Sequence, residues 1–237
     1  MATYSAPHCG LAVVLRFDLC DFFPSVPASR VHALFRTAGY PAEVARLLTG
    51  LGTNIVPAEV LDGCPGAGPW DRYRSPHLPQ GAPTSPALAN LCSHRLDCRL
   101  AALARSLDAG YTRYADDLAF SGGPRLERSV RRFQVLVCRI ALEEGFEVNP
   151  RKSRFMRQGV RQQLAGVVLN RRLNVRRVEY DRLKAILTNC LRHGPASQNR
   201  DGHKDFKAHL AGRIAYVAML NPSRGQRLWE AFDRVAW

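Results

Sequence analysis

Hydrophobic and polar residues alternate along the chain with two periods, one typical of strands and one typical of helices. Residues 11–17 form a short apolar run, which predicts a buried strand that ends at Asp18. Residues 111–121 hold two strand-favouring segments around a polar turn and predict a hairpin. Further strand segments are expected at 146–148, 164–170 and 173–175.

Apolar residues elsewhere recur mostly at helical spacing. Two helices with a break at 39–41 are predicted over 27–50, and single helices over 84–110 and 124–145, where proline stands near the start and glycine at the end. Residues 50–76 are rich in Gly and Pro and predict an irregular connection. This order of elements predicts an α+β fold. The last helices are expected at 178–192, 204–219 and 223–235.

Length and composition exclude several classes of protein. The chain has 237 residues, of which 46% are hydrophobic and 23% charged, as in ordinary globular proteins. These values exclude disorder, a collagen-like repeat and a coiled coil as descriptions of the whole chain. No apolar run reaches the roughly 20 residues of a membrane-spanning helix, so we expect no membrane partner.

The charge is strongly basic. Lys and Arg total 34 against 20 Asp and Glu, a formal net charge of +14, and only four of the 34 are Lys, so 30 are Arg. Arginine binds phosphate through two parallel hydrogen bonds. Residues 125–177 alone hold 14 basic and four acidic residues. This excess predicts nucleic-acid binding, although a basic solvated surface would give the same composition.

The seven cysteines lack the spacing of a zinc site or of a thiol redox motif. We interpret them as small core residues of a protein in a reducing compartment. Together with the absence of a secretory signal pattern at the start, this predicts a cytoplasmic location.

Three carboxylates are candidates for chemistry. Asp18 follows the first strand, and Asp116 and Asp117 are adjacent in the predicted hairpin turn. Two like charges between apolar strands are unfavourable, and a divalent cation would relieve them, because Mg²⁺ binds a few carboxylates together with phosphate oxygens. If the first strand pairs with the hairpin, the three carboxylates meet at one sheet edge. An ordinary solvated turn is the alternative for an isolated Asp-Asp pair.

The chain also contains motifs in a particular order. They are Asp18-Leu-Cys-Asp-Phe-Phe-Pro-Ser, Leu78-Pro-Gln-Gly-Ala-Pro-Thr-Ser-Pro, Tyr114-Ala-Asp-Asp, Asn149-Pro-Arg-Lys-Ser-Arg, Leu164-Ala-Gly-Val and Gly212-Arg-Ile-Ala-Tyr-Val. Together they resemble bacterial reverse transcriptases, the retron and group II intron branch most closely. The resemblance covers nearly the whole chain, from about residue 8 to 237.

The resemblance implies an α+β right-hand polymerase fold. A palm is expected over residues 1–177, including a primer-grip-like hairpin at 164–175, and a helical thumb-like region over 178–237. Only 17 residues precede Asp18. We therefore expect the fingers to be largely absent, through a shortened chain, a misplaced start, or fingers supplied by another polypeptide.

The resemblance further implies RNA-directed DNA synthesis, in which a primer 3′-hydroxyl attacks a dNTP with the help of two Mg²⁺ ions, or Mn²⁺ in their place. Asp18, Asp116 and Asp117 match the metal-binding residues of the family, joined by the backbone carbonyl of Leu19. Lys152 matches a lysine near the leaving pyrophosphate, where it would act as a general acid. An ordinary solvated lysine is the alternative.

The resemblance assigns the other site residues to two groups. Phe23 matches a bulky ring beneath the sugar that excludes a 2′-hydroxyl. The residues expected at the dNTP are Asp21, Phe22, Phe23 and Gln80. Those expected at template and primer are Gly81, Tyr114, Ala115, Arg151, Arg154 and Gly166.

The expected partners are an RNA template, a DNA or RNA primer, dNTPs and a cognate structured non-coding RNA. Two other functions stay open. One is a catalytically incomplete polymerase remnant that binds RNA. The other is a polymerase of antiviral defence that makes DNA without a template.

Overall fold

The computed structural model describes residues 2–63 and 70–237, which form two compact units. Val13–Phe155 form the first, called the sheet unit here. Residues up to Ala12 together with Met156–Trp237 form the second, called the terminal unit. The expected insertion in the Gly- and Pro-rich stretch falls largely on residues 64–69, which lie outside the described residues.

The sheet unit is built on a four-stranded sheet of order β2-β3-β1-β4. Its strands are β1 (Val13–Cys20), β2 (Gly110–Tyr114), β3 (Asp117–Gly122) and β4 (Glu147–Arg157). The central strand β3 pairs antiparallel with both β1 and β2. The sequence therefore predicted the 111–121 hairpin and the strand before Asp18 correctly, and the mixed helix and sheet content agrees with an α+β fold.

Two predicted strand limits are wrong. Strand β1 continues past Asp18 to Cys20, because Leu19 still packs into the core and is only 2% exposed. Strand β4 extends over 11 residues, where the sequence predicted a short strand and a turn at Asn149-Pro150. Proline is tolerated in β4 because this strand lies at the edge of the sheet.

The two faces of β1 have different characters. Its odd-numbered apolar residues belong to the main core, together with Leu118 and Phe120 of β3. The even-numbered residues Arg16 and Asp18 point to the other face, as the two-residue period of a strand requires. The core residues of β1 are Val13, Leu15, Phe17 and Leu19.

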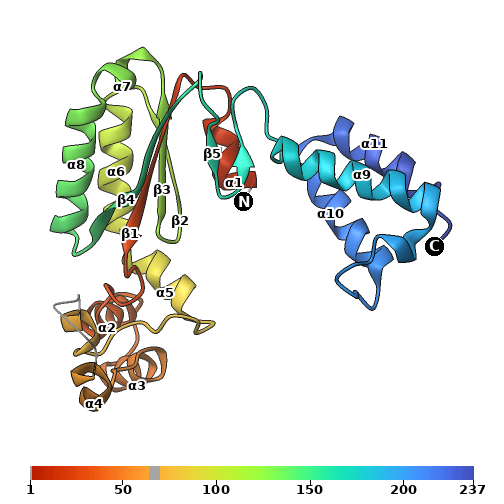
Figure 1. Ribbon diagram of the computed structural model, residues 1–237. Coiled ribbons are helices and arrows are strands. Elements are labelled where there is room, and N and C mark those ends of the chain that lie inside the picture. Colours follow the sequence, from red (N-terminus) through yellow and green to blue (C-terminus); the bar gives the residue numbers. More distant parts are fainter. Residues whose placement is uncertain (1, 64–69) are drawn as a thin grey trace. The chain divides into compact units, whose positions relative to one another are not determined.

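Helices cover the core face and the end of the sheet. Helices α6 (His94–Arg105) and α8 (Val130–Glu143) lie side by side against the core face (Figure 1). The other helical segments are α2 (Ala28–Thr37), α3 (Ala42–Gly52), α4 (Ala58–Asp62), η2 (Trp70–Tyr73), α5 (Ser85–Cys92) and α7 (Pro124–Arg128). Helices α2 to α5 gather at the end of the sheet where β1 finishes (Figure 1).

Two helices that were predicted as continuous are each divided by a serine. Ser93 separates α5 from α6, and Ser129 separates α7 from α8. Both serines have ψ close to 0°, outside the α-helical range. A non-helical backbone of this kind favours serine over residues with stronger helix propensity. The apolar periodicity continues across each division, which is why the sequence pattern did not reveal it.

The terminal unit combines a small sheet with helices. It contains α1 (Ala2–Ser5), η1 (Ala6–His8), β5 (Gln163–Leu164), β6 (Val167–Val168), α9 (Arg177–His193), η3 (Pro195–Ser197), α10 (Phe206–Leu220) and α11 (Pro222–Phe232). Three helices near the predicted positions are thus confirmed. The β5–β6 turn uses Ala165 and Gly166, both with positive φ, as a two-residue hairpin of this hand requires.

Residues 156–170 pack with the start of the chain. Gln158 N donates to Ala12 O at 3.0 Å, and Gly10 N donates to Leu169 O at 2.9 Å. The predicted domain boundary at residue 177 therefore falls inside the terminal unit. The palm and thumb-like assignments stay predictions.

Within the described residues, no helix combines the length and the apolar character needed to cross a bilayer. The described cysteines, all except Cys64, are free thiols.

We predict that Gly225→Ala destabilises the terminal unit. A Cβ at Gly225 would lie 2.3 Å from both Cα and Cβ of Ala218, where α10 and α11 cross. Overpacking of this kind costs about 3 kcal/mol of unfolding free energy, measurable by urea denaturation. Gly212→Ala in α10 is the control, because a Cβ there meets nothing within 4 Å. Equal stability of the two variants would contradict the close packing.

We also predict that stability depends on His8 at acid pH. Burial lowers the pKa of His8 from 6.5 to about 4. Between these values the unfolded chain binds a proton that the folded chain excludes, so the free energy of unfolding decreases as pH falls through this range. The loss reaches about 3 kcal/mol near pH 4 and is absent above pH 6.5.

Urea midpoints between pH 4.5 and 7.5 measure this slope. His8→Gln removes the titrating group and should flatten the slope, whereas His193→Gln on the exposed end of α9 should leave it unchanged. A slope that persists in His8→Gln would show that another group is responsible.

Candidate active site

Sheet pairing brings the three predicted carboxylates together. Asp18 of β1 lies directly opposite Asp117 of β3 in the register. Leu19 N donates to the backbone oxygen of Asp116 at 3.0 Å, which joins the hairpin turn to β1. The strand pairing on which the sequence inference depended is therefore present, and the carboxylates lie at the ends of the two central strands.

The turn that carries Asp116 is held by a buried arginine. Ala115 adopts φ 51°, a strained value for a residue with a Cβ. The guanidinium of Arg113 donates to Ala115 O at 3.2 Å and forms a two-point ion pair with Asp97 at 2.8 and 2.7 Å. Tyr111 Oη donates to the same carboxylate at 2.7 Å. Helix α6 thereby fixes the hairpin, and only tertiary contact supplies this support.

Asp18 is the most buried of the three, at 4% exposure. Lys152 Nζ lies 3.2 Å from each of its carboxylate oxygens. The buried Oδ2 has this ion pair but accepts no hydrogen bond from the described residues. Hydrogen bonding and charge from Asp18 raise the pKa of Lys152, so the lysine is protonated at neutral pH.

Asp116 and Asp117 differ in their surroundings. Burial, with the nearby charges of Asp117 and Asp18, raises the pKa of Asp116, and Lys152 opposes this only in part. Asp117 instead accepts a hydrogen bond from Arg16 Nε at 2.7 Å. Three carboxylates thus face two cations, Arg16 and Lys152, on this face of the sheet.

These surroundings fit a divalent cation in part. Asp18 offers an oxygen without a hydrogen bond, and Asp116 is half-buried with a destabilised charge, which are conditions that a cation would relieve. The described residues contain no group of three or more His, Cys, Asp or Glu side chains arranged to hold a metal ion. Asp117 is paired with Arg16 instead. Two carboxylates suit Mg²⁺, which keeps several non-protein ligands.

A pocket of about 380 Å³ adjoins these carboxylates. Most of the predicted metal and dNTP residues line it, but Asp117 does not. The lining residues are Asp18, Leu19, Cys20, Asp21, Phe22, Phe23, Pro24, Gln80, Asp116, Asn149 and Lys152. The pocket is therefore bounded by the end of β1, the following turn, the segment before α5, the hairpin turn and β4.

The two adjacent phenylalanines have different environments. Phe22 is 5% exposed and stacks on Phe146 with ring centroids 5.5 Å apart. Phe23 is only half-buried and meets Phe22 edge-on at 5.4 Å. Phe22 is thus mainly a core residue at the pocket wall, and Phe23 is the ring that stays partly exposed.

The residues predicted at template and primer do not line this pocket. Tyr114 is 49% exposed at the end of β2, and Arg151 and Arg154 are exposed on β4. Gly81 adopts φ 92° in the turn before α5. Gly166 belongs to the terminal unit.

Sequence reasoning missed several residues around the site. Arg16 could have been found, because it lies two residues before Asp18 and so on the same strand face. Asn149 was within a recognised motif, and its Oδ1 accepts from the backbone N of Arg151 at 3.1 Å. Arg72 and Tyr73 contact Asp21 from 51 and 52 residues away, and no local pattern indicated them.

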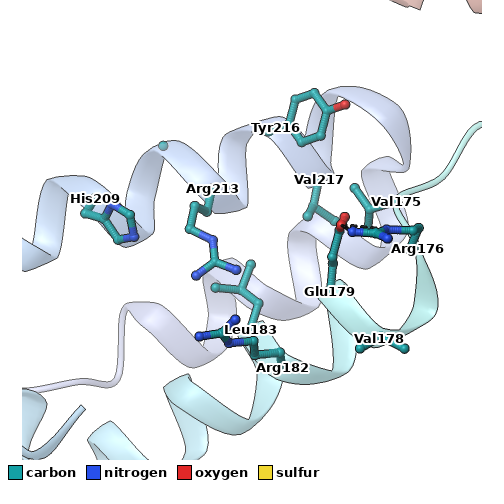
Figure 2. A pocket seen from close by; sticks show the side chains of 11 residues that line it. Val175, Arg176, Val178, Glu179, Arg182, Leu183, His209, Arg213, Tyr216 and Val217 are labelled. Atoms are coloured by element: carbon teal, nitrogen blue, oxygen red, sulfur yellow. Dashed lines mark hydrogen bonds and ion pairs between the residues drawn. The ribbon is translucent and has the colours of Figure 1, made fainter. Parts of the chain in front are cut away.

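The terminal unit has a separate basic groove of about 650 Å³ between α9 and α10. In Figure 2, Arg182 of α9 and Arg213 of α10 extend into the same space, with His209 nearby. Arg176 is less available, because its Nε donates to Glu179 at 2.7 Å. The groove is a candidate surface for phosphate groups.

Known proteins match this chain over most of its length. The family profile described as "Reverse transcriptase (RNA-dependent DNA polymerase)" matches residues 3–181. "Retron Mx65 reverse transcriptase" of Myxococcus xanthus is 44% identical over 95% of this chain and 50% of its own length.

Two other relatives are similar. "Retron Mx162 reverse transcriptase" of Myxococcus xanthus is 35% identical over 94% of this chain and 48% of its own. "Retron Ec86 reverse transcriptase" of Escherichia coli is 32% identical over 94% of this chain and 61% of its own. The chain thus spans about half to three-fifths of the length of these relatives. The profile match, which covers most of the chain, shows that it belongs to the reverse transcriptase family.

Proposed function

We propose that this chain is an RNA-directed DNA polymerase that extends a DNA or RNA primer on an RNA template. The observation that carries the proposal is the meeting of Asp18 and Asp116 at a pocket that Phe23 and Gln80 also line. Val13–Phe155 would act as the palm and the helices from Arg177 onward as a thumb-like region. Family membership supports the reaction class.

The proposed reaction is a nucleotidyl transfer. The primer 3′-oxygen forms a bond to the α-phosphorus of the dNTP, the bond from that phosphorus to the bridging oxygen breaks, and pyrophosphate leaves as the hydroxyl loses its proton. Two divalent ions would supply charge neutralisation of the phosphates and activation of the hydroxyl. Asp18 and Asp116 would hold them with the carbonyl of Leu19, and Asp117 would join after release from Arg16.

Lys152 would serve the leaving group. It is protonated and lies at the pocket wall, 3.2 Å from Asp18. A cation bound at Asp18 would weaken that ion pair and free the ammonium for the pyrophosphate oxygens. Lys152 could then donate a proton to the leaving group as a general acid.

Phe23, Gln80 and the turn at Asp21 would bind the nucleotide. The half-buried ring of Phe23 would lie under the sugar, where a 2′-hydroxyl would collide with it. Phe22 would support that ring from the core, and Gln80 would contact the nucleotide beside the templating base.

Template and primer would lie along basic surfaces of both units. Exposed Arg151 and Arg154 on β4 would bind phosphates in the sheet unit. In the terminal unit, the groove of Arg182 and Arg213 would do the same. Template or primer would also contact the ring of Tyr114 and the backbone of Gly81, Ala115 and Gly166. Because three relatives are named as retron enzymes, the proposal includes a cognate structured non-coding RNA as a partner. The proposed location is the cytoplasm.

A second candidate function is RNA binding without catalysis. It is favoured by the ion pair between Asp117 and Arg16, because Asp117 is the one of the three carboxylates that does not line the pocket. Both functions predict salt-dependent RNA binding. Only the polymerase function predicts DNA synthesis.

We predict that Asp116→Asn lowers primer extension by about 100-fold or more, because it removes a charge that would hold the catalytic cations. The measurement is extension of a primed RNA template with dNTPs and Mg²⁺. RNA binding, measured by gel shift, should stay within about twofold of the wild type.

Asp108→Asn is the matched control, since Asp108 is an exposed carboxylate just before the same hairpin and its φ of 52° suits asparagine. Equal synthesis by wild type and Asp116→Asn would contradict the metal assignment. An inactive wild type that still binds RNA would favour the second candidate function.

We also predict that Phe23→Val lowers the preference for dNTPs over NTPs by about tenfold. The reason is that the variant loses one steric contact with the 2′-hydroxyl, which is worth about 1.4 kcal/mol. The ratio of kcat/KM for dCTP and CTP on the same primed RNA measures this. Phe35→Val, at another half-buried ring in α2, should leave the ratio unchanged. An unchanged ratio in Phe23→Val would remove this ring from the sugar site.

A further inference from the structure

The turn after β1 contains a strained residue at the pocket. Asp21 adopts φ 44°, in the left-handed region that residues with a Cβ seldom occupy. The backbone of the turn is closed by Ser25, whose N and Oγ donate to Asp21 O at 2.8 and 2.9 Å. The position of Phe23 depends on this turn, because Phe23 follows Asp21 by two residues.

A group from a distant segment holds the Asp21 side chain. Tyr73 Oη donates to Asp21 Oδ1 at 3.1 Å, and Arg72 Nη1 lies 3.8 Å from Oδ2. The same Nη1 donates to Cys20 O at 3.4 Å, and Nη2 donates to Glu147 of β4 at 2.9 Å. Arg72 therefore links the turn to the neighbouring strand. We call Asp21, Arg72, Tyr73 and Glu147 the Asp21 cluster.

We propose that Tyr73 and Arg72 are positioning residues that keep the Asp21 turn, and with it the Phe23 ring, in the geometry that discriminates deoxyribonucleotides from ribonucleotides. The inference rests on the proposed polymerase function and extends it to two residues outside the recognised motifs. Neither side chain lines the pocket, so both act through Asp21.

The surrounding contacts confine the effect of the Asp21 cluster to the turn. Phe22 is anchored independently by its stacking on Phe146 and by the core. The side chains of Arg72, Asp21 and Glu147 are 26%, 30% and 54% exposed, and none of them belongs to the hydrophobic core cluster. Loss of the cluster should therefore free the Asp21 backbone without unfolding the sheet.

The hydroxyl of Tyr73 is suited to this role. Burial and the charge of Asp21 raise the pKa of Tyr73, so the hydroxyl keeps its proton and donates to the carboxylate at neutral pH. Arginine is suited to the second position, because its planar guanidinium reaches three acceptors at once, which a lysine cannot reproduce.

The test compares Tyr73→Phe and Arg72→Ala with the wild type on a primed RNA template. The readouts are kcat and KM for dCTP and for CTP, and the thermal midpoint. Two matched controls come from the same region. Tyr40→Phe alters an exposed tyrosine, and Arg74→Ala removes an exposed ion pair with Asp62 two residues from Arg72.

We expect each cluster variant to lower the dCTP-over-CTP ratio of kcat/KM by roughly three- to tenfold, the effect of one hydrogen bond. The change should come from a higher KM for dCTP and a lower KM for CTP, with kcat for dCTP within about twofold and the thermal midpoint unchanged. Arg72→Lys should fall between wild type and Arg72→Ala. The controls should match the wild type.

The outcomes separate the two proposals. A wild type that extends primers, with the same ratio in both cluster variants, overturns the positioning role and leaves the polymerase function standing. A wild type that uses dCTP and CTP equally, or controls that change as much as the cluster variants, also overturns it. A wild type that makes no DNA overturns the proposed function, and the inference falls with it.

Discussion

The pairing of β1 with β3 is the constraint on which the site depends. It places Asp18 opposite Asp117 on a single face of the sheet, while the alternate residues of both strands fill the core. Like charges across a strand pair are unfavourable. The fold compensates with Arg16 on Asp117 and Lys152 on Asp18. A slip of one residue in register would bury the carboxylates in the core and expose the apolar residues.

The same charges underlie the proposed chemistry of the site. Three carboxylates and two cations leave a local negative excess, which adds to burial in raising the pKa of Asp116. Such an excess lowers stability in the free protein and favours a bound cation. The Asp117–Arg16 ion pair would compete with the proposed cation binding, so exchange of Arg16 for a cation would be part of assembling the site.

Strained turns surround the site, and each is held by a side chain from elsewhere. Arg113 supports Ala115 in the hairpin turn, and the Asp21 cluster supports the turn after β1. A rigid sheet whose turns are held in this way would keep the site residues within the small tolerances that the proposed nucleotidyl transfer requires. The basic groove of the terminal unit would add charge for the proposed nucleic-acid binding.

The sequence by itself determined the family, the hairpin at 111–121 and most helices, because these depend on local periodicity and on contiguous motifs. It also singled out Asp18, Asp116, Asp117 and Lys152 as candidate site residues. Tertiary structure alone decided that β1 continues past Asp18, that Asp117 faces Arg16, and that Arg72 and Tyr73 reach Asp21. The physical reason is that these ion pairs and hydrogen bonds join residues up to 134 positions apart, and their partners are selected by the register of the sheet rather than by any local pattern.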